Sequence, residues 1–448
     1  VLSGQYLQYV TPRMKPYLLF AAVVLLVWAR TAIENLYVVR HRRHCLHCFV
    51  LVFPLLMLIL PHRSVSVSSV STPAQSIAAV QTLRGSAAAH KVADVEVAGF
   101  LSGGVDSAYL TALARPARTY TISYAEPKYD ESFPARALAR SLGVRNRVRR
   151  ISPGEFWDAV PAVQYHMDEP LADAAAVALY FLNREAAKDV KVVLSGEGAD
   201  ELFGGYNIYR DPFTARWYDR LPPWLRAGLG AAAALLPPAR GVNFLVRRGM
   251  SLEERYFGPT ALFNEREKRR LLADYAGDGD PMFLTEAIWD ATEGLDPVTR
   301  MQQVDLNLWL AGDILLKADK MSMAHSLELR VPFLDREVWA LAAALPAAAK
   351  ADARTTKIAL RRAAARTLPA ASAARKKLGF PVPVRDWLRQ EPYTSRVRAV
   401  FSRPAAAEFF DPRALHSMLN QHLHGGDCWR QIWCVYSFLI WYEQFFGA

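Results

Sequence analysis

The chain has 448 residues, of which 52% are hydrophobic and 22% are charged, and its formal net charge at pH 7 is +11. This balance excludes an intrinsically disordered chain, and the length suits two or three domains. Four cysteines are too few for a disulfide framework, which favours a reducing, cytoplasmic location. Much of the positive charge is Arg on Ala-rich segments such as residues 354–375. That pattern is typical of solvated helix faces, so we expect no nucleic-acid partner.

Residues 1–72 differ in character from the rest of the chain. Two apolar runs, residues 17–29 and 48–60, are each shorter than the ~20 residues that span a bilayer. They are compatible with a signal-peptide core, with membrane contact through residues 17–60, or with buried helices of a small domain. Because residue 1 is Val, a fragment or an upstream frame change is also compatible. The Ser-rich run 64–72 predicts a linker.

From residue 73 onward, helical and strand patterns alternate. Short apolar runs predict strands at residues 95–101, 119–124, 147–151 and 190–194. Helical patterns lie at residues 74–90, 108–113, 131–142, 153–167 and 174–188. This alternation predicts an α/β fold, a doubly wound parallel sheet with helices on both faces. From Pro212 the pattern is mainly helical, which predicts a helical C-terminal part.

The first strand runs into a Gly-rich turn and then a helix, through Ser102-Gly103-Gly104-Val105-Asp106-Ser107. A helix start offers free N–H groups and a favourable dipole to an anion, and glycines let the backbone approach a ligand closely. Serine hydroxyls can donate hydrogen bonds, and Asp106 suits a hard cation. The turn therefore predicts a phosphate cradle, the alternative being a tight turn without a ligand. It resembles the PP-loop of ATP pyrophosphatases, which cleave ATP between its α and β phosphates and adenylate a substrate.

A second loop follows the fourth strand, with the sequence Ser-Gly-Glu-Gly-Ala-Asp-Glu-Leu-Phe-Gly-Gly-Tyr at residues 195–206. Its acidic residues suit Mg²⁺ better than a pyrophosphate, although acidic residues are also favoured at a solvated helix start. In a doubly wound sheet, ligands bind beyond the carboxyl ends of the strands. We therefore expect both loops to face one crevice, with Asp106 and Asp200 sharing Mg²⁺.

The two loops together resemble the synthetase domain of the glutamine-dependent asparagine synthetase family. The resemblance covers about residue 75 to the end of the chain. Further runs fit the same family, at residues 129–132, 166–170, 316–335, 357–361 and 375–381.

The resemblance implies that residues 73–448 form an ATP-dependent amidoligase. It would adenylate a carboxylate, with the aspartate side chain as first candidate, release pyrophosphate, and pass ammonia to the acyl group to give asparagine and AMP. The residues implied to bind ATP are Ser102, Gly103, Gly104, Asp106, Ser107, Ile122, Ser195 and Gly196. The resemblance also implies Glu197 as general base, Lys377 as the cation on the phosphates, and Asp106 and Asp200 as the Mg²⁺ ligands. Arg330 and Asp319 are left open between substrate binding and structural ion pairs.

One departure from the family concerns the nitrogen source. Typical members begin with a catalytic Cys followed by a glutaminase domain, whereas residue 1 here is Val and the first cysteine is Cys45. We therefore expect no intact glutaminase domain in residues 1–72, and ammonia that is free or supplied by a separate glutaminase.

Three other functions remain as alternatives. They are a tailoring ligase that forms an amide on a peptide or secondary metabolite, a tRNA-modifying PP-loop enzyme, and a nucleotide-binding remnant with a membrane-associated N-terminus. The pattern of the second loop disfavours the tRNA-modifying enzyme. The presence of Asp106, Asp200 and Lys377 disfavours the remnant.

Overall fold

The computed structural model describes residues 72–447 except 237–240, 259–261, 278–280 and 376–378. A five-stranded parallel sheet lies within these residues, in the order β3-β2-β1-β4-β5. Its strands are β1 (Val97–Phe100), β2 (Arg118–Ser123), β3 (Arg145–Arg150), β4 (Val192–Leu194) and β5 (Glu328–Arg330). The predicted doubly wound parallel sheet is confirmed, and β5 is an edge strand that the sequence patterns did not predict.

The strand order creates a switch point in the middle of the sheet. The chain passes outward from β1 to β2 and β3, then returns to the other side of β1 for β4 and β5. Strands β1 and β4 are direct neighbours, with Ala98 opposite Val193 and Gly99 opposite Leu194. In open parallel sheets a ligand crevice opens beyond the strand ends at such a point. The two Gly-rich loops, which follow β1 and β4, therefore start side by side.

Alternate strand residues feed two apolar cores, one on each face of the sheet. Ala98 and Val193 belong to one core, whereas Val97 and Val192 belong to the other. The face of Val97 is covered by α3 (Thr72–Ala89), α4 (Val105–Ala114), α5 (Ser132–Leu142), α17 (Arg336–Ala344) and α19 (Ile358–Ala364). The face of Ala98 is covered by α6 (Pro153–Met167), α7 (Ala175–Ala186) and α16 (Leu316–Met323).

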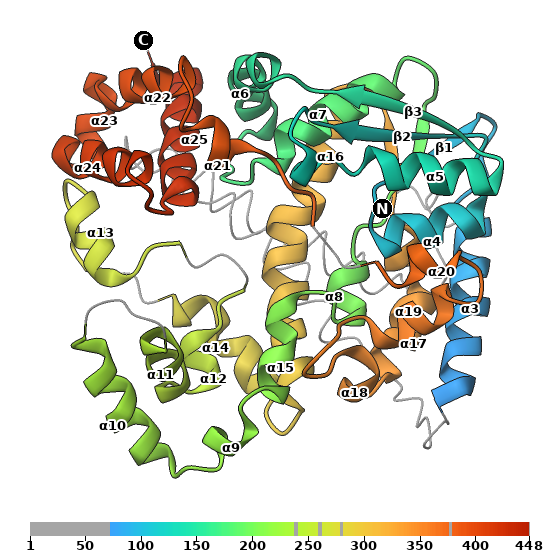
Figure 1. Cartoon of the computed structure of the whole chain (residues 1–448), viewed down its shortest axis with the longest axis horizontal. Helices are drawn as coiled ribbons and strands as arrows, with labels where there is room; N and C mark the ends of the chain where they lie inside the picture. Colours follow the sequence, from blue (N-terminus) through green and yellow to red (C-terminus); the bar gives the residue numbers. More distant parts are fainter. Residues whose placement is uncertain (1–71, 237–240, 259–261, 278–280, 376–378, 448) are drawn as a thin grey trace, which may run out of the picture. The chain divides into compact units, whose positions relative to one another are not determined.

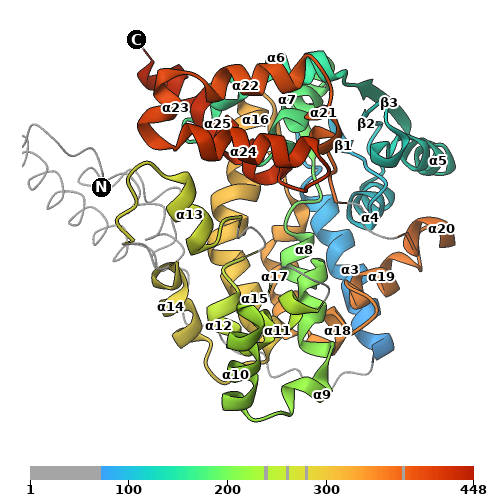
Figure 2. The ribbon, with the colours of Figure 1, turned by 60° about the vertical axis from the view of Figure 1, so that its left-hand side comes forward.

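The C-terminal helices extend the core of Ala98 beyond the sheet. In Figures 1 and 2 they gather beside α6. Trp157 of α6 stacks on Tyr393 with a centroid separation of 5.7 Å and meets Trp433 edge-on at 5.6 Å. Such aromatic pairs add to the free energy gained from burial. The helices are α21 (Val384–Trp387), α22 (Tyr393–Phe401), α23 (Pro404–Phe409), α24 (Pro412–Leu423) and α25 (Trp429–Phe446).

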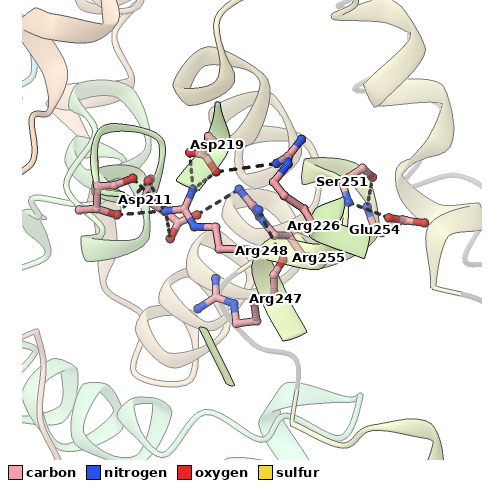
Figure 3. A network of polar contacts seen from close by, with 9 residues as sticks. Asp211, Asp219, Arg226, Arg247, Arg248, Ser251, Glu254 and Arg255 are labelled. Atoms are coloured by element: carbon pink, nitrogen blue, oxygen red, sulfur yellow. Dashed lines mark hydrogen bonds and ion pairs between the residues drawn. The ribbon is translucent and has the colours of Figure 1, made fainter. Parts of the chain in front are cut away.

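A group of short helices begins within the second Gly-rich loop. It comprises α8 (Ala199–Phe203), η4 (Asn207–Phe213), α9 (Arg216–Asp219), α10 (Pro223–Ala234), α11 (Val242–Gly249), α12 (Leu252–Arg255), α13 (Glu265–Leu271) and α14 (Met282–Ala291). Figure 3 shows the polar network that joins α9, α11 and η4. Arg248, only 3% exposed, donates to both carboxylate oxygens of Asp219 and to the backbone oxygens of Asp211 and Thr214.

A long helical run crosses between this group and the sheet (Figure 1). It consists of α15 (Pro297–Val304), the π-helical η5 (Asp305–Leu315) and then α16. π-Helical segments are rare and are frequent at functional sites. The remaining short elements are η3 (Pro127–Tyr129), η6 (Pro332–Leu334), α18 (Ala347–Lys350) and α20 (Ala370–Ala373).

Within the described ranges, no helix combines the length and the apolar character that a membrane-spanning segment needs. The apolar runs at residues 17–29 and 48–60 lie outside the described residues.

Candidate functional site

The loops after β1 and β4 line one cavity of about 350 Å³ at the carboxyl end of the sheet. The expectation that both loops face one crevice is therefore confirmed. The predicted residues that line it are Ser102, Gly104, Asp106, Ser107, Ile122, Ser195, Gly196, Glu197 and Asp200. Gly103 is not among the lining residues. A Cβ there would lie 3.0 Å from Glu131 Oε1 and 3.1 Å from Arg375 Nε. Lys377 lies outside the described residues.

Hydrogen bonds within the first loop fix its shape. Ser102 N and Gly104 N donate to the hydroxyls of Ser107 and Ser102, at 3.0 and 3.1 Å, and the two hydroxyl oxygens are 2.9 Å apart. Among the described residues no side chain caps the start of α4, which leaves its first N–H groups available to an anion. The second loop approaches closely, because a Cβ on Gly196 would lie 3.3 Å from Ser107 N. A larger residue at this contact between the loops would therefore need a small shift of the backbone of Ser107.

Asp106 and Asp200 meet at a lysine that the sequence analysis gave no role. Lys357 Nζ lies 2.5 Å from Asp106 Oδ2 and 2.8 Å from Asp200 Oδ1, and the lysine is only 1% exposed. Burial lowers the pKa of this ammonium, but the two carboxylates raise it by more, so its pKa is above its ordinary value. The group is therefore a fixed positive charge between the two predicted metal ligands.

The Gly204-Gly205 pair admits Lys357 to this position. A Cβ on Gly205 would lie 2.1 Å from Lys357 Cε and 1.8 Å from Asp200 Oδ1, and Lys357 N donates to Gly204 O at 3.3 Å. In the sequence, this contact is indicated only by Lys357 before the apolar start of α19 and by the Gly204-Gly205 pair. Only the fold brings the two together.

The residues at the carboxylate pair fit Mg²⁺. Asp106 Oδ1 is buried and accepts no hydrogen bond from any residue in the described ranges. The described residues contain no group of three or more Asp, Glu, His or Cys side chains arranged to hold a metal. Mg²⁺ is commonly held by one or two carboxylates while phosphate and water oxygens complete its shell. The donor set therefore suits a metal that arrives with a phosphate ligand.

The long helix supplies another wall of the cavity, through Trp309, Ile314 and Lys317. Lys317 Nζ forms an ion pair with Asp173, which also lines the cavity. It forms a second ion pair with Asp313 Oδ2, at 2.7 Å. Burial lowers the pKa of Lys317, but the two carboxylates raise it above its ordinary value. Both signs of charge are therefore present on this wall.

A buried acid lies beside the metal-ligand candidate of the second loop. Burial, and then the charge of Asp200, raise the pKa of Glu201 to about 7. Tyr206 donates its hydroxyl to Glu201 Oε1 at 2.5 Å and accepts from Trp309 Nε1 at 3.0 Å. This chain of contacts links the second loop to the π-helical segment.

Arg330 and Asp319 take no part in the cavity wall. Arg330 Nη1 donates to the backbone oxygens of His90 and Val92, at 2.9 and 2.8 Å, and joins β5 to the end of α3. Asp319 is exposed on α16 and is not among the lining residues. For Arg330, the structural alternative is the one that the contacts support.

Comparisons with known proteins give two family matches. Residues 79–443 match the model described as asparagine synthase, and residues 1–74 match that of a DUF1980 N-terminal domain. A putative asparagine synthetase (glutamine-hydrolyzing) of Mycobacterium tuberculosis is 45% identical over 369 residues, 81% of this chain and 57% of the relative. Asparagine synthetase (glutamine-hydrolyzing) 1 of Bacillus subtilis is 40% identical over 360 residues, 79% of this chain and 57% of the relative.

This chain therefore spans about 57% of the length of these curated relatives. Among solved structures, NMN synthetase from Francisella tularensis matches 30% of this chain and 59% of its own at 18% identity. The TM-score of this match is 0.22.

Proposed function

The chain belongs to the asparagine synthase family, and from this premise we propose that it is an ATP-dependent amidoligase that joins ammonia to the side-chain carboxylate of aspartate. The observation that carries the proposal is the shared cavity. An uncapped helix start, a carboxylate pair and Glu197 line it together. These groups suit phosphate binding, metal binding and proton transfer in turn.

The phosphates of ATP would lie against the first loop. Ser102 and Ser107 supply hydroxyls there, and the start of α4 supplies N–H donors. Gly103 and Gly104 would let the backbone of the turn approach the phosphates closely. Lys377 remains the proposed cation on the phosphates. Asp106 and Asp200 would hold Mg²⁺, which would offset the charge that builds up on the phosphates during transfer.

Apolar side chains support an adenine position beside β2. Ile122 lines the cavity together with Leu179 and Leu182 of α7. Ser195 and Gly196 lie at the end of β4, on the other side of β1 from β2. The nucleoside would therefore extend along the strand ends, from the phosphate cradle toward α7.

The proposed reaction has two steps. A carboxylate oxygen of aspartate attacks the α-phosphorus of ATP, the bond to the bridging oxygen breaks, and pyrophosphate leaves. The nitrogen lone pair of ammonia then attacks the acyl carbon, the C–O bond to AMP breaks, and AMP leaves with one of the original carboxylate oxygens. Glu197 would accept the proton that nitrogen loses, and Ser195 Oγ donates to its Oε1 at 3.3 Å.

The charges on the long-helix wall support a small zwitterionic acid as substrate. Aspartate carries an ammonium and an α-carboxylate besides the carboxylate that reacts. Asp173 and Lys317 line the cavity and offer groups of both complementary signs. Charge-assisted hydrogen bonds of this kind give both strength and orientation.

We propose ammonia as the nitrogen nucleophile at this site. The names of the relatives state that they hydrolyse glutamine, and that activity stays with the relatives because this chain spans 57% of their length. A separate glutaminase is the proposed partner where glutamine is the nitrogen source.

The test follows pyrophosphate, AMP and asparagine from ATP and Mg²⁺, with aspartate plus ammonia in one arm and aspartate plus glutamine in the other. We expect all three products in equal amounts with ammonia, and none with Asp106→Asn. A folded protein that binds ATP but releases no pyrophosphate in response to aspartate would contradict the asparagine reaction. Equal rates with glutamine would contradict the ammonia proposal alone.

A further inference from the structure

Lys357 occupies the space between the two carboxylates that would bind metal. We propose that Lys357 is a positioning residue that holds Asp106 and Asp200 together before nucleotide binds and prevents the pair from capturing a free divalent cation. Metal would then enter with the nucleotide. The inference rests on the proposed function to the extent that it takes a metal–nucleotide complex as the ligand of the cavity.

The three groups come from three separate elements. Asp106 lies in the first turn of α4, Asp200 lies in α8, and Lys357 precedes α19. The ammonium is within 2.8 Å of an oxygen of each acid and is almost completely shielded from solvent. The two carboxylates come from different loops, are only 17% and 18% exposed, and repel each other as like charges. The lysine converts this repulsion into a shared contact.

The path of the lysine side chain is specified by the second loop. A Cβ on Gly205 would overlap both Lys357 Cε and Asp200 Oδ1, at 2.1 and 1.8 Å. The backbone of Gly204 also accepts a hydrogen bond from Lys357 N. The loop that carries Asp200 thus also accommodates the cation that contacts it, which indicates a built arrangement rather than a chance surface pair.

Charge and ligand number explain why free metal would be excluded. Two carboxylates alone carry two negative charges, whereas the pair with Lys357 carries one. One oxygen of each carboxylate already faces the ammonium. No third Asp, Glu, His or Cys completes a metal site within the part of the chain that the structure describes. Nucleotide phosphates would supply both the missing negative charge and the missing oxygen ligands.

The experiment measures Mn²⁺ binding to the full chain by electron paramagnetic resonance, with and without an ATP analogue that carries a methylene group between the α and β phosphates. For the wild type without nucleotide, we expect no Mn²⁺ binding at the carboxylate pair, so Asp106→Asn should change nothing. With the analogue present, we expect a signal from bound Mn²⁺. For Lys357→Met we expect free Mn²⁺ to bind at least tenfold more tightly than in the wild type. Lys91→Met removes a lysine that contacts Ala114 O instead, and is the control expected to match the wild type.

The gained site must belong to the carboxylate pair, so Asp106→Asn combined with Lys357→Met should lose it. A wild-type protein that binds free Mn²⁺ in a manner sensitive to Asp106→Asn would overturn the proposal, and this arm needs no folded lysine variant. A folded Lys357→Met protein without a gain would also overturn it. Failure of the asparagine reaction would show as absent aspartate-dependent pyrophosphate, which leaves these metal-binding readouts unchanged.

Discussion

The carboxyl groups of Glu197 and Asp305 have different surroundings, and we therefore expect them to have different roles. Glu197 lines the cavity and accepts a hydrogen bond from Ser195 Oγ. Asp305 is fully buried at the start of η5, where Tyr209 and Tyr256 both donate to its Oδ2. Burial raises the pKa of Asp305 to about 7, against the lowering effect of the two tyrosine hydrogen bonds. At the scale of single residues, we therefore expect Glu197 to affect chemistry and Asp305 to affect stability.

Glu197→Gln should uncouple the two proposed steps. Gln keeps the size of the side chain but cannot accept the proton, so we expect amide formation to slow by about a hundredfold or more. Adenylation needs no proton acceptor, and pyrophosphate should therefore form faster than asparagine. The ratio of the two products measures this effect. Glu337→Gln, on the exposed side of α17, is the matched control; an equal loss in both variants would be evidence against the assigned role.

Asp305→Asn should flatten the pH dependence of folding stability. With a pKa of about 7 in the folded protein, Asp305 holds a proton that the unfolded chain releases above its ordinary pKa of 3.8. Stability is therefore fullest below pH 4 and is lost as the pH rises toward 7, by about 1.4 kcal/mol per pH unit for this group. Asn keeps an oxygen acceptor for the tyrosines and cannot ionise. Urea unfolding at pH 5, 6 and 7 compares the slopes, and identical slopes would refute the assignment.

At the scale of elements, the strand order places the two Gly-rich loops side by side at the switch point between β1 and β4. The long helix and α19 then bring Lys317 and Lys357 to the same region. The two loops, the long helical run and α19 reach the cavity region through different connections of the chain. Substitutions in these elements should therefore have separable effects on geometry and stability.

Gly205→Ala should damage the site while leaving the fold intact. The added methyl would overlap the flexible ends of Asp200 and Lys357, which can move only by giving up their contact. We expect pyrophosphate release to fall at least tenfold with little change in melting temperature. Gly228→Ala is the control, because a Cβ there meets nothing within 4 Å and α10 should gain about 0.5–1 kcal/mol. Parallel behaviour of the two variants would argue against the steric account.

Arg248→Met should loosen the helices around α9 to α12. It would leave Asp219 and the Thr214 backbone oxygen without their main buried donor. Because both acids of the network are partly exposed, we expect a cost of about 2 kcal/mol, below that of a fully buried pair. Limited proteolysis should show faster cleavage within residues 207–255. Arg247→Met removes an exposed neighbour on the same helix, and equal protease sensitivity would contradict the role of the network.

Most of the sheet and of the two loops could be predicted from the sequence because their signals are local. Buried strands, Gly-rich turns and helix starts follow one another within a few residues at β1 and β4. Strand β5 has only three residues, too few for a local strand signal, so its pairing with β4 depends on the rest of the fold. The role of Lys357 could not be predicted for the same reason, because only the tertiary structure brings Asp106 and Asp200 to it.

At the scale of the whole molecule, all described residues belong to one compact unit, residues 65–448. The proposed boundary between residues 72 and 73 places the phosphate cradle, the carboxylate pair and the long-helix wall together on the C-terminal side. A protein consisting of residues 65–448 should therefore retain ammonia-dependent pyrophosphate release at the rate of the full chain. A folded but inactive product would mean that the first residues contribute to the chemistry.

The proposed adenylation of the side-chain carboxylate of aspartate can be followed through the oxygen atom that it transfers. Aspartate labelled with ¹⁸O in that carboxylate, incubated with ATP, Mg²⁺ and ammonia, gives AMP whose phosphorus can be read by ³¹P nuclear magnetic resonance. We expect one ¹⁸O in each AMP formed, because the attacking carboxylate oxygen leaves with the nucleotide. Unlabelled AMP, or ADP with the label in inorganic phosphate, would contradict it.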